Sequence, residues 1–267
     1  MHETARIVPH APQVHETAIV HPGARLGAGC TVGPYAVIGD GVELGAGCEV
    51  MSHVRIDGPL VAGSGNRFFH GAAIGGLPQD LKYDGADSRV RIGNANIFRE
   101  FVTVNRATGQ REATEIGNDN LLMAYVHVAH DCVLSDHTIL GNSVNLAGHV
   151  IVEDYAIVGG VTPVHQFTRI GRHAIVGGGS RVPKDVLPFM KAAGNPLRVV
   201  GPNSVGLRRR GFSEETRRTI KEAFRLLCRS GLNVSQAVER IHEELPDSAE
   251  LRVLLEFIHA SRRGICV

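Results

Sequence analysis

Residues 116–182 read IGNDNLLMAYVHVAHDCVLSDHTILGNSVNLAGHVIVEDYAIVGGVTPVHQFTRIGRHAIVGGGSRV, and an aliphatic residue returns at every sixth position. The series consists of Ile116, Leu122, Val128, Leu134, Leu140, Leu146, Val152, Val158, Val164, Ile170, Val176 and Val182. A glycine often follows the aliphatic residue. Because a period of six fits neither a 3.6-residue helix nor an alternating strand, the stretch predicts short flat strands joined by tight corners.

The same period extends toward the N-terminus. It runs through Val14, Val20, Leu26, Val32, Ile38, Leu44, Val50 and Ile56. It weakens at Ala62 and Phe68, recovers at Ile74 and resumes at Ile92. Three short strands make one coil of 18 residues, and stacked coils add parallel strands about 4.8 Å apart. The sequence therefore predicts a mainly β protein, built as a parallel β-helix with three flat faces.

Two segments break the period, and the C-terminal region follows a different pattern. Residues 77–89 and roughly 110–115 are expected to loop out of the prism. Further along, capping residues predict three helices. These helices would begin at Ser213, Asn233 and Ser248 and end near Arg229, before Pro246 and near Arg263. We predict a β-helix catalytic domain over 1–190 with the two loop insertions and a small α-helical domain over 191–267.

Composition narrows the class of protein. Lys and Arg total 28 against 27 Asp and Glu, so no strong field favours nucleic acid as a partner. No apolar stretch reaches the roughly 20 residues of a transmembrane helix, and Met1 to Arg6 lack the pattern of a secretory signal. We expect a cytoplasmic protein. Cys30 and Cys48 lie one coil apart at an inward position, which indicates core residues.

Four of the 14 histidines are predicted to share one edge of the prism, since positions 18 residues apart stack on successive coils. These are His127, His130, His149 and His165. Gly148 stacks on His130 itself. A neutral imidazole could remove a hydroxyl proton, the Gly148 N–H could stabilise an oxyanion, and Asp131 could orient the imidazole. The pattern favours acyl transfer to a hydroxyl, while a zinc site and a passive polar edge remain open.

Six strings identify a resemblance that covers essentially the whole chain. They are Gln79-Asp-Leu-Lys-Tyr83, Asp119-Asn-Leu-Leu-Met123, His127-Val-Ala-His-Asp-Cys132, Leu146-Ala-Gly-His149, Val164-His-Gln-Phe167 and Gly206-Leu-Arg-Arg-Arg-Gly-Phe212. In this order they resemble the UDP-N-acetylglucosamine O-acyltransferases. The resemblance implies a left-handed β-helix, although the usual crossover rule favours the opposite hand.

The resemblance also implies an activity and partners. The expected reaction is transfer of a 3-hydroxyacyl chain from acyl carrier protein to the 3-hydroxyl of UDP-N-acetylglucosamine, the first step of lipid A biosynthesis. No cofactor or metal is expected, because the acyl group arrives on the phosphopantetheine arm of the carrier. The family forms homotrimers with sites between subunits.

Site residues follow from the same resemblance. His130 is the expected general base, Asp131 its support and Gly148 the oxyanion donor. Substrate contacts are expected from Asp80, Lys82, His127, His149, His165, Gln166, Asn203 and Arg209. Gly178 is expected to measure the acyl tail, and a glycine there implies room for a long chain.

Some positions depart from the family pattern. Asn105 and Pro196 stand where relatives carry histidine, and Val205 stands where some carry glutamate near the nucleotide. These departures leave open a sugar acceptor with a 3-amino group. A zinc hydratase of the γ-carbonic anhydrase type is a second alternative, but the pair of histidines five apart that it needs does not occur after Val14. A non-catalytic scaffold is a third.

Overall fold

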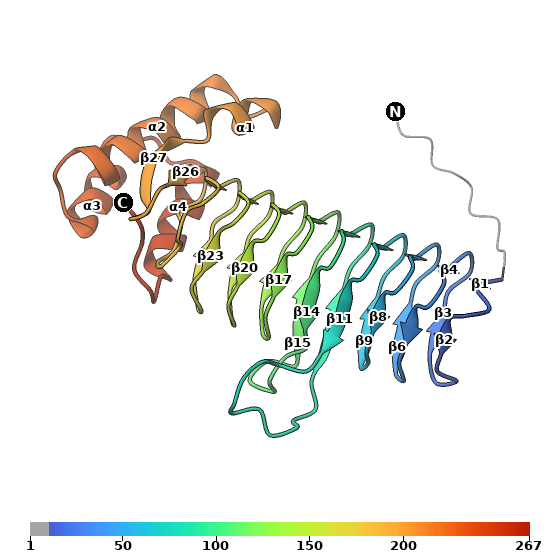
Figure 1. Ribbon diagram of the computed structural model, residues 1–267. Coiled ribbons are helices and arrows are strands. Elements are labelled where there is room, and N and C mark those ends of the chain that lie inside the picture. The colour runs from blue at the N-terminus through green and yellow to red at the C-terminus, as the bar shows by residue number, and fades with distance from the viewer. Residues whose placement is uncertain (1–10) are drawn as a thin grey trace.

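The computed structural model describes residues 11–267. The prediction made on Met1 to Arg6 therefore lies outside the described residues. The strands wind into a long three-faced prism, and the helices gather at its C-terminal end (Figure 1). The predicted left-handed parallel β-helix of hexapeptide repeats is confirmed.

Each face of the prism is one sheet. Sheet A contains β1 (Gln13–Val14), β4 (Thr31–Val32), β7 (Glu49–Val50), β10 (Arg67–Phe68), β13 (Ile97–Phe98), β16 (Leu121–Leu122), β19 (Ile139–Leu140), β22 (Ile157–Val158), β25 (Ile175–Val176), β26 (Met190–Ala193) and β27 (Arg198–Pro202). Sheet B contains β2 (Ile19–Val20), β5 (Val37–Ile38), β8 (Arg55–Ile56), β11 (Ala73–Gly76), β14 (Thr103–Asn105), β17 (His127–Val128), β20 (Asn145–Leu146) and β23 (Pro163–Val164). Sheet C contains β3 (Arg25–Leu26), β6 (Val42–Leu44), β9 (Leu60–Ala62), β12 (Arg89–Ile92), β15 (Ala113–Ile116), β18 (Val133–Leu134), β21 (Ile151–Val152) and β24 (Arg169–Ile170). These strands pair in parallel except β26 with β27, which is antiparallel.

The repeating aliphatic residues fill the inside of the prism, and Cys30 and Cys48 are buried among them as predicted. The weakening of the period expected at Ala62 and Phe68 is wrong. Both side chains are buried in register, and the Phe68 ring stacks on Phe98 with centroids 5.0 Å apart. A large ring therefore occupies the same inward position as an aliphatic side chain, and the period continues without interruption to the first insertion.

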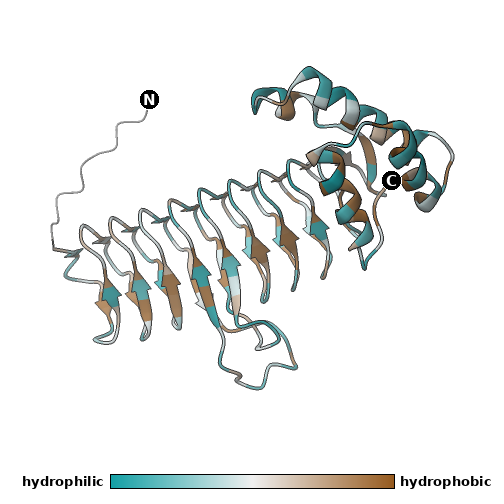
Figure 2. Cartoon of the chain, turned by 180° about the vertical axis from the view of Figure 1, so that it is seen from behind, coloured by the Kyte–Doolittle hydropathy of each residue, from teal (hydrophilic) through white to brown (hydrophobic). Residues whose placement is uncertain are grey.

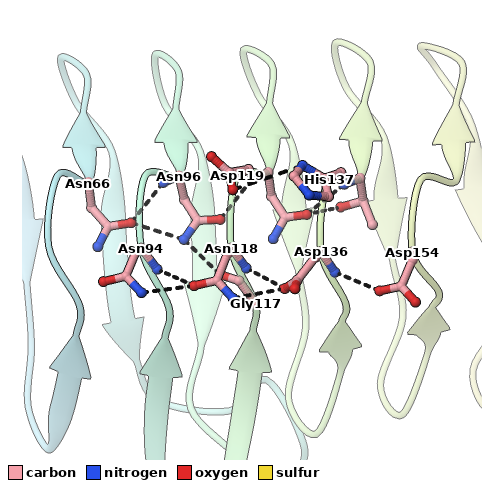
Figure 3. Close-up of polar contacts among 11 residues, drawn as sticks. Asn66, Asn94, Asn96, Gly117, Asn118, Asp119, Asp136, His137 and Asp154 are labelled. Atoms are coloured by element: carbon pink, nitrogen blue, oxygen red, sulfur yellow. Dashed lines mark hydrogen bonds and ion pairs between the residues drawn. The ribbon is translucent and has the colours of Figure 1, made fainter. Parts of the chain in front are cut away.

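Buried asparagines form a ladder inside the corner between sheets C and A (Figure 3). The Asn96 amide nitrogen donates to the Asn66 side-chain oxygen at 3.0 Å and to the Gly117 carbonyl at 2.8 Å. One coil further, the Asn120 oxygen accepts from the Thr138 hydroxyl at 2.7 Å. Each amide satisfies the backbone of the next coil, and the ladder thus provides directional bonds in a core that is otherwise apolar.

Both insertions leave the prism at the corner between sheets B and C, which we call the B–C edge. The first, residues 77–88, connects β11 to β12, and the second, residues 106–112, connects β14 to β15. Together they form the loops that hang below the prism in Figure 1. The histidine corner 129–132 lies between β17 and β18, at the same edge and one coil further along.

The C-terminal part contains α1 (Ser204–Arg209), α2 (Glu214–Arg229), α3 (Val234–Glu244) and α4 (Ala249–His259). The side chains of the capping residues Ser213, Asn233 and Ser248 accept the expected backbone hydrogen bonds. The apolar sides of the helices face one another and the end of the prism (Figure 2). None of the helices within residues 11–267 has the length and apolar character needed to cross a membrane.

Three features of this part differ from the sequence prediction. The hairpin of β26 and β27 and the short α1 were not expected. The last helix ends at His259 and not near Arg263, because the chain turns back to the prism: the Gly264 carbonyl accepts from the Asp185 N–H at 3.0 Å, and the Cys266 N–H donates to the Asp185 carbonyl at 2.8 Å. The basic run that begins at Arg208 lies on α1 and its C-cap.

Candidate active site

The B–C edge brings His130, Asp131, Gly148 and His149 together on two successive coils. The His130 and His149 rings meet edge to face with centroids 5.2 Å apart. Asp131 and His149 occupy equivalent corner positions and both have left-handed backbone conformations, with φ of 60° and 62°. The 18-residue stacking predicted for these positions is therefore present in the fold.

His130 and Asp131 form a hydrogen-bonded dyad. The His130 Nδ1 lies 2.7 Å from Asp131 Oδ2, and the Asp131 side chain is fully buried. Burial alone would raise the pKa of Asp131, but hydrogen bonds from His130 and Thr108 outweigh it and hold that pKa below its ordinary value. Because the carboxylate fixes Nδ1 as the protonated nitrogen, Nε2 keeps a lone pair that can accept a proton.

Gly148 lies directly against the imidazole. A Cβ added to Gly148 would stand 2.6 Å from His130 Nε2, closer than van der Waals contact allows. The Gly148 N–H has no hydrogen-bond partner among residues 11–267. A glycine here therefore leaves room for the imidazole, and the backbone N–H of the same residue is available as a donor to an oxyanion.

Two further histidines flank the dyad. His127 shares a hydrogen bond of 2.7 Å with the Thr103 hydroxyl, and burial, followed by the charge of His130, lowers its pKa. His149 stacks on Phe167 with centroids 4.5 Å apart, its Nε2 lies 3.6 Å from Asp131 Oδ2, and burial is the largest cause of its lowered pKa. Both rings are thus neutral near pH 7 and suited to hydrogen bonding.

His165 and Gln166 lie on the same edge one coil beyond Gly148. The strand register aligns His127 with Asn145 and then Pro163, so His165 stands two coils from Ala129. The His165 Nδ1 is 3.0 Å from the Gln166 carbonyl oxygen.

The first insertion adds Asp80 and Lys82 to this edge. Together with Thr108 and Gln110 of the second insertion they line a hollow of about 330 Å³. The Asp80 carboxylate accepts from the Lys82 N–H at 2.9 Å, which fixes the local turn.

Three predicted site residues lie elsewhere on the chain. Gly178 is at the corner between sheets A and B. Asn203 is the N-cap of α1, and Arg209 is the last residue of that helix. The Asn203 side chain accepts from the Gly206 N–H at 3.1 Å and donates to the His173 carbonyl at 2.9 Å. Arg209 is exposed. One chain therefore does not place these residues on the edge that carries His130.

Sequence reasoning missed the residues that hold the dyad. Thr108, Arg111 and Thr114 all bond to Asp131, and Thr103 bonds to His127. The first two belong to an insertion, where the six-residue period gives no position. A buried carboxylate needs donors, and that was the only signal that partners had to exist.

The cluster can also be compared with a metal centre. Within residues 11–267, one set of three or more histidine, cysteine or acidic side chains has all its possible ligand atoms within 4.8 Å of one another. It consists of His130, Asp131 and His149. However, both Asp131 oxygens already accept hydrogen bonds, and the His130 nitrogen is at hydrogen-bond distance from one of them. This arrangement favours an acid–base dyad over a set of zinc ligands.

Comparison with known proteins first defines the class. Residues 23–58 match the family described as bacterial transferase hexapeptide (six repeats). Residues 185–266 match the family described as UDP-N-acetylglucosamine O-acyltransferase, domain 2. A hexapeptide prism with a buried His–Asp dyad on one edge and this C-terminal part defines a hexapeptide-repeat acyltransferase.

Individual relatives narrow the class to one family. The acyl-[acyl-carrier-protein]–UDP-N-acetylglucosamine O-acyltransferase of Verminephrobacter eiseniae is 49% identical over 258 residues, 94% of this chain and 98% of that protein. That of Thiobacillus denitrificans is 46% identical over 253 residues, with the same coverage. The UDP-N-acetylglucosamine acyltransferase structure from Bacteroides fragilis matches with a TM-score of 0.93 at 40% identity, covering 95% of this chain and 99% of that one. The structure of the enzyme from Acinetobacter baumannii matches with a TM-score of 0.92 at 41% sequence identity, with the same coverage of both chains. The chain belongs to the acyl-[acyl-carrier-protein]–UDP-N-acetylglucosamine O-acyltransferase family, and the resemblance found in the sequence is confirmed.

Proposed function

We propose that this protein transfers a 3-hydroxyacyl chain from acyl carrier protein to the 3-hydroxyl of UDP-N-acetylglucosamine, the first step of lipid A biosynthesis. The observation that carries the proposal is the His130–Asp131 dyad with Gly148 packed against its imidazole, where the Gly148 N–H has no partner among residues 11–267. This arrangement occurs in a chain that matches acyl-[acyl-carrier-protein]–UDP-N-acetylglucosamine O-acyltransferases over 94% of its length.

The chain's own groups account for each step of the reaction. His130 Nε2 takes the proton from the sugar hydroxyl as its oxygen attacks the thioester carbonyl. Asp131 stabilises the imidazolium that forms, and the Gly148 N–H donates to the oxyanion. When the tetrahedral intermediate collapses, the carbon–sulfur bond breaks and the imidazolium returns its proton to the phosphopantetheine thiolate. No cofactor takes part in this sequence.

The acyl tail is proposed to lie along a strip without large side chains. Gly160 and Gly178 stack at the corner between sheets A and B, with a Cβ built on Gly178 only 3.2 Å from the Gly160 carbonyl oxygen. The outward-facing Ile157 and Ile175 follow the same strip on sheet A. A thin apolar chain fits beside such a surface, and the absence of a side chain at Gly178 favours a long tail.

A homotrimer is part of the proposal. Gly178, Asn203 and Arg209 do not share an edge with His130 in one chain, so a neighbouring copy would complete the site, as the family resemblance implies. Arg209, exposed at the end of α1, is proposed to bind the nucleotide phosphates. The proposed location is the cytoplasm, where acyl carrier protein and nucleotide sugars are made.

Asn105 favours testing a second acceptor. By the resemblance, Asn105 stands where relatives carry histidine. It is 7% exposed and donates through its amide nitrogen to the Leu77 carbonyl at 2.9 Å. A neutral amide that holds the first insertion cannot exchange protons as a histidine can. A sugar with a 3-amino group, which is a stronger nucleophile than a hydroxyl, therefore remains the alternative acceptor.

The test is direct incubation of the purified protein with UDP-N-acetylglucosamine or its 3-amino analogue and a series of 3-hydroxyacyl carrier proteins. Product mass identifies both the acceptor and the acyl length. His130→Ala should abolish transfer and leave the oligomer and its unfolding temperature unchanged. Activity retained in His130→Ala would refute the assigned base, and absence of any acylated sugar with the wild-type protein would refute the function.

A further inference from the structure

The second insertion, residues 106–112, does more than bridge two strands. We propose that it is a positioning element for the catalytic dyad and that Thr108 is its principal residue. The inference rests on the proposed function, because it concerns how Asp131 orients His130 during proton transfer. The Thr108 hydroxyl is bonded to the Asp131 carboxylate, so the proposed role is exerted through Asp131.

The bonds to Asp131 come mainly from this segment. The Thr108 hydroxyl donates to Oδ2 at 2.7 Å, the same oxygen that receives His130 Nδ1. The N–H groups of Thr108 and Arg111 donate to Oδ1 at 3.3 and 3.2 Å. Just after the insertion, the buried Thr114 hydroxyl accepts from the Asp131 N–H at 2.9 Å. Residues 108–114 thus hold both carboxylate oxygens and the backbone of Asp131.

The position of Asp131 makes these bonds necessary. Its side chain is fully buried, and an isolated carboxylate there would take up a proton to avoid the cost of desolvation. Its backbone has a φ of 60°, a conformation that most side chains avoid. Without donors from the insertion, the carboxylate would be free to turn, and His130 Nδ1 would lose its fixed partner.

The same segment contacts the first insertion. A Cβ built on Gly109 would stand 2.7 Å from the Ala86 Cβ, so the two loops are in close contact there. Thr108 also lines the hollow shared with Asp80 and Lys82. The loop that the resemblance assigns to substrate binding therefore lies against the loop that holds the carboxylate.

Thr108→Val tests the proposal, with Thr108→Ser as the matched control. Valine keeps the shape and removes the hydroxyl, while serine keeps the hydroxyl and removes a methyl group. We expect Thr108→Val to lower kcat about tenfold and to leave KM unchanged. About tenfold is the order expected when a carboxylate loses one charge-assisted hydrogen bond and keeps its other donors. The acidic limb of its pH–rate profile should move to lower pH, because a less well held carboxylate stabilises the imidazolium less. Thr108→Ser should match the wild type.

A second measurement does not depend on activity. An imidazole N–H bonded to a carboxylate gives a strongly deshielded proton NMR signal, which His130→Ala identifies by its loss. This signal should move upfield in Thr108→Val and stay in place in Thr108→Ser. An unchanged signal and an unshifted acidic limb in Thr108→Val would overturn the inference, as would equal losses in both variants. An inactive wild type with the expected NMR shifts would count against the proposed function alone.

Discussion

Gly148→Ala is the most informative single substitution, since it changes one methyl group against the proposed base. The added Cβ would stand 2.6 Å from His130 Nε2 and 3.1 Å from Nδ1, and closer still to Cε1. Ordinary contact needs about 3.5 Å, so the ring has to move by roughly 1 Å. The Gly148 backbone does not have a positive φ, so alanine itself causes no backbone strain. The damage is therefore confined to the imidazole.

The size of the effect follows from that displacement. A movement of about 1 Å breaks the 2.7 Å bond between His130 Nδ1 and Asp131 Oδ2 and turns Nε2 away from the sugar hydroxyl. Misplacement on this scale costs on the order of 10²-fold in rate. We expect kcat to fall by about that factor, with a small change in KM and in the unfolding temperature. The Gly148 N–H remains, so the oxyanion donor is not lost.

The assay is acyl transfer measured by product mass, with Gly39→Ala as the control. Gly39 is a corner glycine on a distant coil, where an added Cβ meets no atom closer than 3.3 Å. The double variant Gly148→Ala, His130→Ala should be no less active than His130→Ala alone, because both changes remove the same base. A folded Gly148→Ala enzyme with activity within threefold of the wild type would show that His130 is not the group that removes the proton.

Two further predictions concern stability. Burial and two nearby arginines lower the pKa of His173 to about 4, so between about pH 6.5 and pH 4 the unfolded chain binds a proton that the folded chain does not. Denaturant titrations should show the His173 contribution to stability falling over that range by about 2 kcal/mol, less than the roughly 3.4 kcal/mol of an unscreened group because the ring is partly exposed to solvent. His173→Phe should remove this part of the pH dependence. Asn96→Ala should lower the free energy of unfolding by about 2–4 kcal/mol, because it leaves buried polar groups of the ladder without partners. An Asn96→Ala protein as stable as the wild type would refute that role for the ladder.

The period in the sequence was sufficient to stack His130, Gly148 and His149. Within an uninterrupted run each residue advances the chain by a fixed angle around the axis, so counting by 18 gives spatial neighbours. The rule fails across an insertion. Thr103 aligns with His127, which is 24 residues later, because the residues of the second insertion loop out and do not advance the chain around the axis. Capping residues located the starts of three helices for an equally local reason.

Only the tertiary structure decided what surrounds the dyad. An insertion has no period, so the sequence of residues 106–112 does not predict that the Thr108 hydroxyl bonds to Asp131. Nor does the sequence show that Arg209 lies away from the edge of His130, since Arg209 follows the end of the repeat and counting by 18 does not apply to it. The sequence alone therefore determined the coil and its stacked imidazoles, because repeated local geometry propagates along the axis. The charge, orientation and completeness of the site depend on contacts between segments whose paths no repeat dictates.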